Sequence, residues 1–199
     1  MSLEKTVSIL FHPVFVPTIT VFLVIKIYSN IIILENQAGI ILIGTCVFSL
    51  ILPLLSVFIL LLTKKIDSLE MPKKEERFLP ILFGSIWMIL GFYFMKEIFS
   101  YAPIMKSIYL GAIYVMLISL LITKKWKISL HMLAIGSATG VFIILEFLFG
   151  QNLMLLLITI LISGILGYSR LNLKAHSLSQ IYAGFIVGNI IMGLSILYL

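Results

Sequence analysis

The fold class follows from residues 39–62, which read GIILIGTCVFSLILPLLSVFILLL and contain no charged side chain. A helix needs about 20 mainly apolar residues to cross the hydrocarbon core of a bilayer, and this stretch is long enough. Within a bilayer the main-chain polar groups must be satisfied inside the segment itself, which an α-helix achieves. Residues 39–62 therefore predict a membrane-spanning helix.

Other apolar stretches of similar length follow along the chain, at residues 7–25, 78–95, 107–123, 129–145, 152–168 and 177–199. The 199 residues are 61% hydrophobic and 11% charged, with a mean hydropathy of +1.21. A soluble domain cannot cover so much apolar surface with so few charges. We predict an all-α, polytopic transmembrane helical bundle of about seven (six to seven) membrane-spanning helices, forming a single integral membrane domain over residues 1–199.

Several residues predict local features of this bundle. Pro13, Pro17 and Pro53 predict kinks in the first two helices, which membrane bundles tolerate when neighbours satisfy the freed carbonyls. The Gly-Gln-Asn sequence at residues 150–152 predicts a turn between the fifth and sixth helices. A single cysteine, Cys46, excludes a disulfide framework and a cysteine-rich metal site.

The basic residues are distributed unevenly between the two sides of the predicted membrane. Seven crossings place the N-terminus and the loops after helices two, four and six on one side, here called side A. Side A carries 11 of the 14 lysines and arginines: Lys5, Lys64, Lys65, Lys73, Lys74, Arg77, Lys124, Lys125, Lys127, Arg170 and Lys174. The opposite side B carries Lys26, Lys96 and Lys106. Because basic loops favour the cytoplasm, we expect side A to face the cytoplasm, across a bacterial cytoplasmic (inner) membrane.

Small residues recur in two of the predicted helices. The fifth contains Gly-Ser-Ala-Thr-Gly at residues 136–140, and the seventh contains Gly184 and Gly188, four residues apart. Such spacing lets helix backbones approach closely. Each group lies just inside a helix that has a histidine at its side A end, His131 and His176 respectively. Close packing of these helices would bring the two imidazoles together.

The acidic residues argue against a metal-dependent enzyme. Magnesium sites that handle lipid pyrophosphates need several clustered carboxylates, and Asp67 is the only aspartate in the chain. Glu70, Glu75 and Glu76 alternate with lysines, as expected for a solvated, charge-balanced face. The chain contains no His-Glu-x-x-His zinc motif. We therefore predict neither a metal nor another cofactor.

What remains on side A is a metal-free set of polar residues: Lys73, Lys74, Arg77, Ser129, His131, Arg170 and His176. Guanidinium and ammonium groups bind phosphate oxygens, and a helix N-terminus adds free N–H groups. One imidazole could attack phosphorus while the other protonates the leaving oxygen. Taken singly, such residues are explained by long side chains that reach the membrane interface. His12, next to Pro13, could join this site, although helix initiation is its ordinary explanation.

The order of these residues resembles a known set of signatures. Ser169-Arg170, followed after five residues by His176 and then by Gln180, resembles Ser-Arg-x5-His-x3-Asp, the third signature of the type 2 phosphatidic acid phosphatase superfamily. Residues 128–131, Ile-Ser-Leu-His, match the second signature, Pro-Ser-Gly-His, in part. The first signature, a lysine upstream of Arg-Pro, is matched loosely by Lys73 or Lys74, Arg77 and Pro80.

This resemblance implies a role for each matched position. It makes His176 the nucleophile and His131 the general acid. Gln180 stands where the family has the aspartate that orients the nucleophile. A glutamine carbonyl can accept the imidazole N–H, but it cannot stabilise an imidazolium as a carboxylate does. The resemblance assigns phosphate binding to Lys73, Lys74, Arg77, Ser129, Ser169 and Arg170.

The sequence thus predicts a membrane-embedded, metal-independent phosphatase that acts on a lipid phosphate or polyprenyl (pyro)phosphate through a phosphohistidine. The alternative is a non-catalytic member of the same fold that binds an anionic lipid or serves as a structural subunit of a membrane complex, and Gln180 favours it. The expected partners are the lipid bilayer, a lipid phosphate substrate and a membrane protein or second copy of the chain; nucleic acid is not expected. A small carrier lacks support because intramembrane charges are nearly absent.

Overall fold

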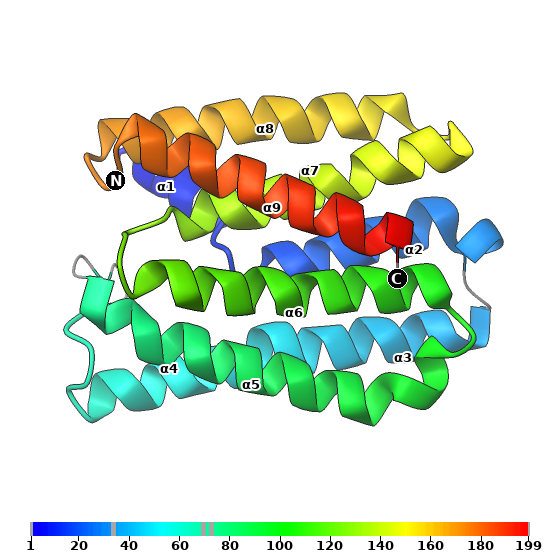
Figure 1. Cartoon of the computed structure of the whole chain (residues 1–199), viewed down its shortest axis with the longest axis horizontal. Helices are drawn as coiled ribbons and strands as arrows, with labels where there is room; N and C mark the ends of the chain where they lie inside the picture. Colours follow the sequence, from blue (N-terminus) through cyan, green and yellow to red (C-terminus); the bar gives the residue numbers. More distant parts are fainter. Residues whose placement is uncertain (1, 33–34, 69–70, 72–73, 199) are drawn as a thin grey trace.

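The structure is a computed structural model that describes residues 2–32, 35–68, 71 and 74–198. Every regular element within these ranges is helical, as the sequence predicts. Figure 1 shows an elongated bundle built from α1 (Leu3–Leu10), α2 (Val16–Ile32), α3 (Glu35–Cys46), the π-helix η1 (Val47–Ile51), α4 (Leu52–Leu62), α5 (Lys74–Phe99), α6 (Pro103–Thr123), α7 (Leu130–Phe149), α8 (Leu153–Asn172) and α9 (Leu178–Tyr198).

Six segments of the described chain are long and apolar enough to cross a membrane. One of them, Gln37–Leu62, joins α3, η1 and α4, and the others correspond to α5, α6, α7, α8 and α9. The sequence placed the start of α6 at residue 107, but the helix begins at Pro103 and includes Lys106 in its first turn. The six long apolar segments agree with the prediction of a polytopic helical bundle with six to seven crossings.

The first predicted helix, at residues 7–25, is wrong as a single element. α1 ends at Leu10, residues 11–15 form turns, and α2 begins at Val16. Pro13 cannot donate a main-chain hydrogen bond and its ring obstructs the preceding turn, so the chain breaks here instead of kinking. The apolar part of α2, Val16–Tyr28, is shorter than the six long spans.

Pro17 and Pro53 are accommodated differently. Pro17 lies in the first turn of α2, where a missing N–H costs nothing because it would have no partner within the helix. Pro53 follows η1, whose wider turn has the N–H of Leu52 bonded to the carbonyl of Val47. A proline leaves carbonyls of the preceding turn without a hydrogen-bond donor. A π-turn such as η1 commonly supplies the missing hydrogen bonds.

α7 and α9 are packed with their backbones in contact, as the small-residue pattern predicts. A methyl group added at Gly184 would lie 2.7 Å from the carbonyl oxygen of Ser129, and one added at Gly140 would lie 2.6 Å from that of Asn189. Gly136 and Gly188 likewise face main-chain atoms of the opposite helix. Only glycine fits at such contacts, so the four glycines fix the register in which α7 meets α9.

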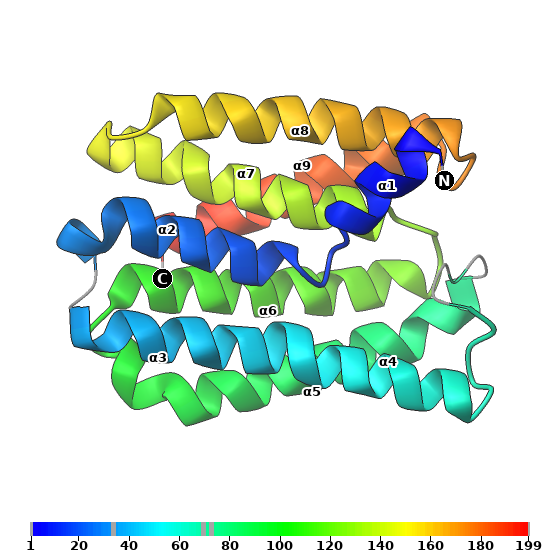
Figure 2. The ribbon, with the colours of Figure 1, turned by 180° about the vertical axis from the view of Figure 1, so that it is seen from behind.

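The connections between helices separate the two ends of the bundle. The N-terminus, the α6–α7 and α8–α9 connections, the end of α4 and the start of α5 all lie at one end in Figures 1 and 2. This end contains those residues of side A that the structure describes. At the other end, Gly150 leaves α7 with a φ of 60° and Asn152 caps α8 by accepting the N–H of Leu155 at 2.9 Å, which confirms the predicted turn.

Candidate functional site

His176 is held by the N-terminal cap of α9. The N–H of Gln180 donates to Oγ of Ser177 at 3.4 Å, and Oε1 of Gln180 accepts the N–H of Ser177 at 3.2 Å. This reciprocal pair is a capping box, which starts the helix at this point. The same Oε1 lies 3.0 Å from Nδ1 of His176. Because an amide oxygen can only accept, Nδ1 of His176 carries the hydrogen, and in the neutral ring Nε2 has the free lone pair.

The surroundings of His176 keep its ring neutral. Its side chain is 6% exposed. Burial, followed by the positive charges of Arg77, Arg170 and Lys127, lowers the pKa of His176 from 6.5 to about 4, against the opposing hydrogen bond from Gln180. A neutral imidazole with an unprotonated Nε2 is the form that a nucleophile requires.

His131 lies in the first turn of α7 and contacts the N-terminal helix. Ser129 caps α7 through its Oγ, which accepts the N–H of Met132, while its own N–H donates to the carbonyl of Gln180 at 3.4 Å. This bond adds to the glycine contacts that join the ends of α7 and α9. Nε2 of His131 lies 3.1 Å from the main-chain oxygen of Ser8 in α1. A carbonyl cannot donate, so Nε2 of His131 carries the hydrogen.

His12 is a third histidine in the same place. Its ring meets that of His131 edge to face, with centroids 5.3 Å apart. Nδ1 of His12 accepts the N–H of Val14 at 3.4 Å. Burial, with the charge of Arg170, lowers the pKa of His12 from 6.5 to about 4. The break between α1 and α2 therefore places His12 inside the cluster, which is the alternative that the sequence left open beside helix initiation.

Three cations complete the cluster. Arg77 is 5% exposed and donates from Nε to the carbonyl of Met71 at 3.0 Å and from Nη1 to that of Ile128 at 3.4 Å. Arg170, in the last turn of α8, interacts electrostatically with Arg77 and with all three histidines. Burial, then Arg77 and Arg170, lowers the pKa of Lys127. Such a concentration of like charge beside neutral imidazoles creates a positive potential that favours an anion.

The outcome for the predicted site residues is mixed. The structure brings together Arg77, Ser129, His131, Arg170, His176 and Gln180. Ser169 is 2% exposed and its hydroxyl donates to the carbonyl of Ile165 at 2.8 Å, so it has no hydrogen left for a phosphate oxygen. Lys73 and the side chain of Lys74 lie outside the described residues.

Sequence reasoning left three participants out of the site. Lys127 was identified only as one of the 11 basic residues of side A, and His12 was identified only as an alternative member of the site. The carbonyl of Ser8 has no side-chain signature at all. Among the described residues no group of three His, Cys, Asp or Glu side chains is placed to hold a metal ion.

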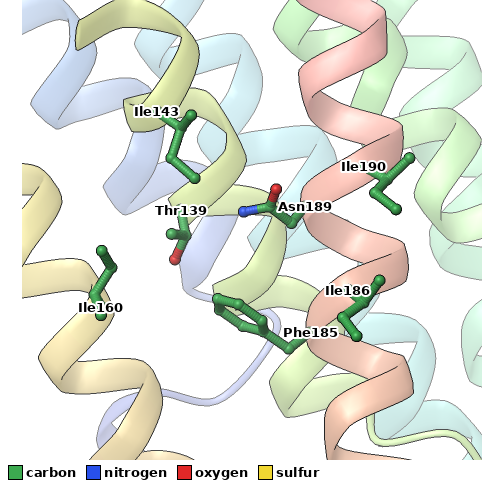
Figure 3. A pocket seen from close by; sticks show the side chains of 7 residues that line it. All are labelled: Thr139, Ile143, Ile160, Phe185, Ile186, Asn189 and Ile190. Atoms are coloured by element: carbon green, nitrogen blue, oxygen red, sulfur yellow. The ribbon is translucent and has the colours of Figure 1, made fainter. Parts of the chain in front are cut away.

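A separate hollow of about 350 Å³ lies between α7, α8 and α9 (Figure 3). Thr139 and Asn189 are its polar residues, and the rest of its lining is apolar. Thr139 lies eight residues beyond His131 on α7, or about 12 Å along the helix axis. The hollow therefore sits at mid-membrane depth, away from the histidine cluster.

Comparison with known proteins gives no match: no family model, no curated protein and no solved structure matches this chain. The relation to the phosphatidic acid phosphatase superfamily therefore stays a prediction carried by the residues of the three signatures.

Proposed function

We propose that this protein is a membrane-embedded, metal-independent phosphatase of lipid phosphates or polyprenyl (pyro)phosphates. The observation that carries the proposal is the state of His176. Its Nδ1–H is held by Gln180, its Nε2 lone pair is available, and Arg77, Arg170 and Lys127 surround it with positive charge. A nucleophilic nitrogen surrounded by positive charge is suited to attack at phosphorus.

The proposed reaction has two displacements. Nε2 of His176 attacks phosphorus, the bond from phosphorus to the leaving oxygen breaks, and protonated His131 gives its proton to that oxygen. Water then attacks the phosphohistidine, its proton passes to His131, and the N–P bond breaks to release phosphate and restore His176. Arg77 and Arg170 stabilise the charge on the phosphate oxygens in both steps.

The position of the cluster fits an amphiphilic substrate. The cluster lies at the side A end of helices that are apolar enough to span the bilayer. A phosphate headgroup bound there would leave its hydrocarbon chain in the lipid. This geometry supports lipid phosphates over soluble phosphate esters as substrates.

Phosphate release from a panel of lipid phosphates by the purified protein tests the proposal, with and without vanadate and a chelator. We expect release that vanadate inhibits and the chelator leaves unchanged. Arg170→Lys should reduce the rate about tenfold to a hundredfold, because a point charge replaces a bidentate fork worth about 1.5–3 kcal/mol per charged hydrogen bond. No release from any lipid phosphate would contradict the proposal.

The second candidate is a non-catalytic protein that binds an anionic lipid. It is favoured by Gln180, whose amide already has a structural role in the capping box and supplies no negative charge to an imidazolium. In this case the protein would bind anionic lipid through Arg170 without releasing phosphate. A vesicle-binding assay with Arg170→Ala alongside the phosphatase assay separates the two functions.

We also propose that side A faces the cytoplasm of a bacterial inner membrane, which the 11 of 14 basic residues on that side support. Single cysteines introduced at Lys124 or Lys125, in a Cys46→Ser background, should react with a membrane-impermeant thiol reagent only after the membrane is opened. Labelling in intact cells would place side A outside.

A further inference from the structure

The hydrogen bond between His131 and α1 gives the N-terminal helix a part in the site. Nε2 of His131 lies 3.1 Å from the main-chain oxygen of Ser8, and this oxygen is an obligate acceptor. The hydrogen of the neutral ring is therefore fixed on Nε2, and Nδ1 is a bare acceptor. His176 has the opposite arrangement, with the hydrogen on Nδ1.

Ser8 is suited to this contact by its size. It is 6% exposed, and its hydroxyl finds no hydrogen-bond partner among the described residues. The hydroxyl is thus not what holds α1 in place. A small side chain at this buried position instead lets α1 pack against α8 with the carbonyl of Ser8 within reach of the His131 side chain.

From this geometry we infer that α1 is a positioning element, which fixes His131 as a proton acceptor so that the site takes a phosphate monoester in its singly protonated form. The ester's remaining proton passes from a phosphate oxygen to Nδ1 of His131. This leaves a dianion between the arginines and an imidazolium ready to protonate the leaving oxygen. The inference rests on the proposed function for its catalytic meaning, but its binding chemistry can be tested without turnover.

The described neighbours of His131 do not supply its ring with a proton. The groups that act on it electrostatically are Arg170 from α8, His12 from the α1–α2 turn and His176 from the α8–α9 connection. Neither of these histidines is held in its charged form, since desolvation and the positive charge of Arg170 lower the pKa of both. The site without its ligand therefore has no proton to donate to a leaving group, and a singly protonated phosphate would supply it.

The tautomers can be read directly, because the chain has only three histidines. Nitrogen-15 NMR of histidine-labelled protein in bilayers near pH 7.5 should give hydrogen on Nε2 for His131 and His12 and on Nδ1 for His176. His12→Asn and His176→Asn variants assign the signals. Hydrogen on Nδ1 of His131 would overturn the inference, whatever the protein does to lipid phosphates.

A matched pair of variants at Ser8 tests the role of α1. Ser8→Ala keeps the carbonyl and the small side chain, whereas Ser8→Leu should displace α1 and move the carbonyl of residue 8 away from His131. We would measure binding of a short-chain alkyl phosphate by calorimetry from pH 5.5 to 8.5, in buffers of different ionisation enthalpy. Such a monoester has a second pKa of about 6, so affinity in the parent and in Ser8→Ala should fall about tenfold per pH unit above that value.

In Ser8→Leu the ring of His131 loses its bond to the carbonyl and can turn an N–H toward the phosphate. The dianion should then bind, and the affinity should fall less steeply as the pH rises. Identical pH profiles for Ser8→Ala and Ser8→Leu would contradict the inference. Normal proton-coupled binding without phosphate release, in contrast, would contradict only the proposed phosphatase activity.

Discussion

α7 and the Gln37–Leu62 span are both strongly apolar, with hydropathies of 2.1 and 2.7, yet they occupy opposite environments. Of the most apolar part of α7, 61% is buried inside the protein, against 22% for Gln37–Leu62. The more hydrophobic segment, Gln37–Leu62, is thus the less buried of the two. What separates them is contact: Gly140 of α7 faces a main-chain carbonyl of α9, whereas Gly44 faces the flexible end of Met95. In lipid, small residues against backbone mark the centre of a bundle better than hydrophobicity does.

The same comparison distinguishes the proposed site from the rest of side A. The closely packed α7–α9 pair has His131 in the first turn of α7 and His176 just before α9, whereas the Gln37–Leu62 span leads into the loop that contains Asp67. The largest expected effect tests this division. His176→Ala should abolish phosphate release, because no phosphohistidine can form, whereas Asp67→Asn should leave the rate within about twofold, as expected for a solvated surface change.

Both rates are measured on detergent-purified protein with the same lipid phosphate. Asp67→Asn is the control, because it removes a charge from an exposed side chain of that loop. Loss of activity in Asp67→Asn together with full activity in His176→Ala would move the chemistry to the loop that the Gln37–Leu62 span supports.

The next effect tests packing alone. Gly188→Ala puts a methyl group against main-chain atoms of Leu133 and Ser137 and should destabilise the protein by about 1–3 kcal/mol. Gly44→Ala meets only the side chain of Met95, which can move aside, so its cost should be well under 1 kcal/mol. Thermal unfolding in detergent measures both. Equal losses would mean that the α7–α9 contact is not special.

The sequence predicted the α7–α9 contact because glycine spacing is a local pattern with a direct packing meaning. It missed the break at residues 11–15, since those residues are as apolar as their neighbours and a proline alone does not distinguish a kink from an end. It also missed the role of Ser8, because a main-chain carbonyl looks the same at every position. Arg77 was found by its charge, but its bonds to Met71 and Ile128 depend on how two loops meet.

A pH-dependent effect comes from the two histidines whose pKa is about 4, His12 and His176. An unfolded chain binds a proton at each of them below about pH 6.5, whereas the folded protein does so only near pH 4. The unfolded state thus takes up more protons between these values, and stability falls as the pH is lowered from 6.5 to 4. The unfolding temperature should drop across this window, and less so in His12→Phe, which keeps a ring beside His131. A drop above pH 6.5 instead would contradict the assignment.

The smallest effect concerns Gln180, where the capping box and the nucleophile share one oxygen. Gln180→Glu keeps the side-chain length, and glutamate at this position also forms a capping box, so α9 should begin unchanged. The tautomer of His176 is already set by the amide oxygen, so a carboxylate adds only charge. As Nε2 bonds to phosphorus the ring becomes positive, and that charge should raise the rate about tenfold, or roughly 1.4 kcal/mol.

The same negative charge opposes phosphate binding, so KM should rise with kcat. Gln180→Asp is the matched comparison, because its side chain is one methylene shorter and would have to reach both the N–H of Ser177 and Nδ1 of His176. It should therefore gain less than Gln180→Glu. Steady-state kinetics of the three proteins measure the split between kcat and KM. If Gln180→Glu unfolds at the same temperature as the parent and shows the same kcat, Gln180 serves α9 and not the reaction. The amide would then act only by holding the ring of His176 at the start of α9, and the charge at position 180 would not limit the reaction.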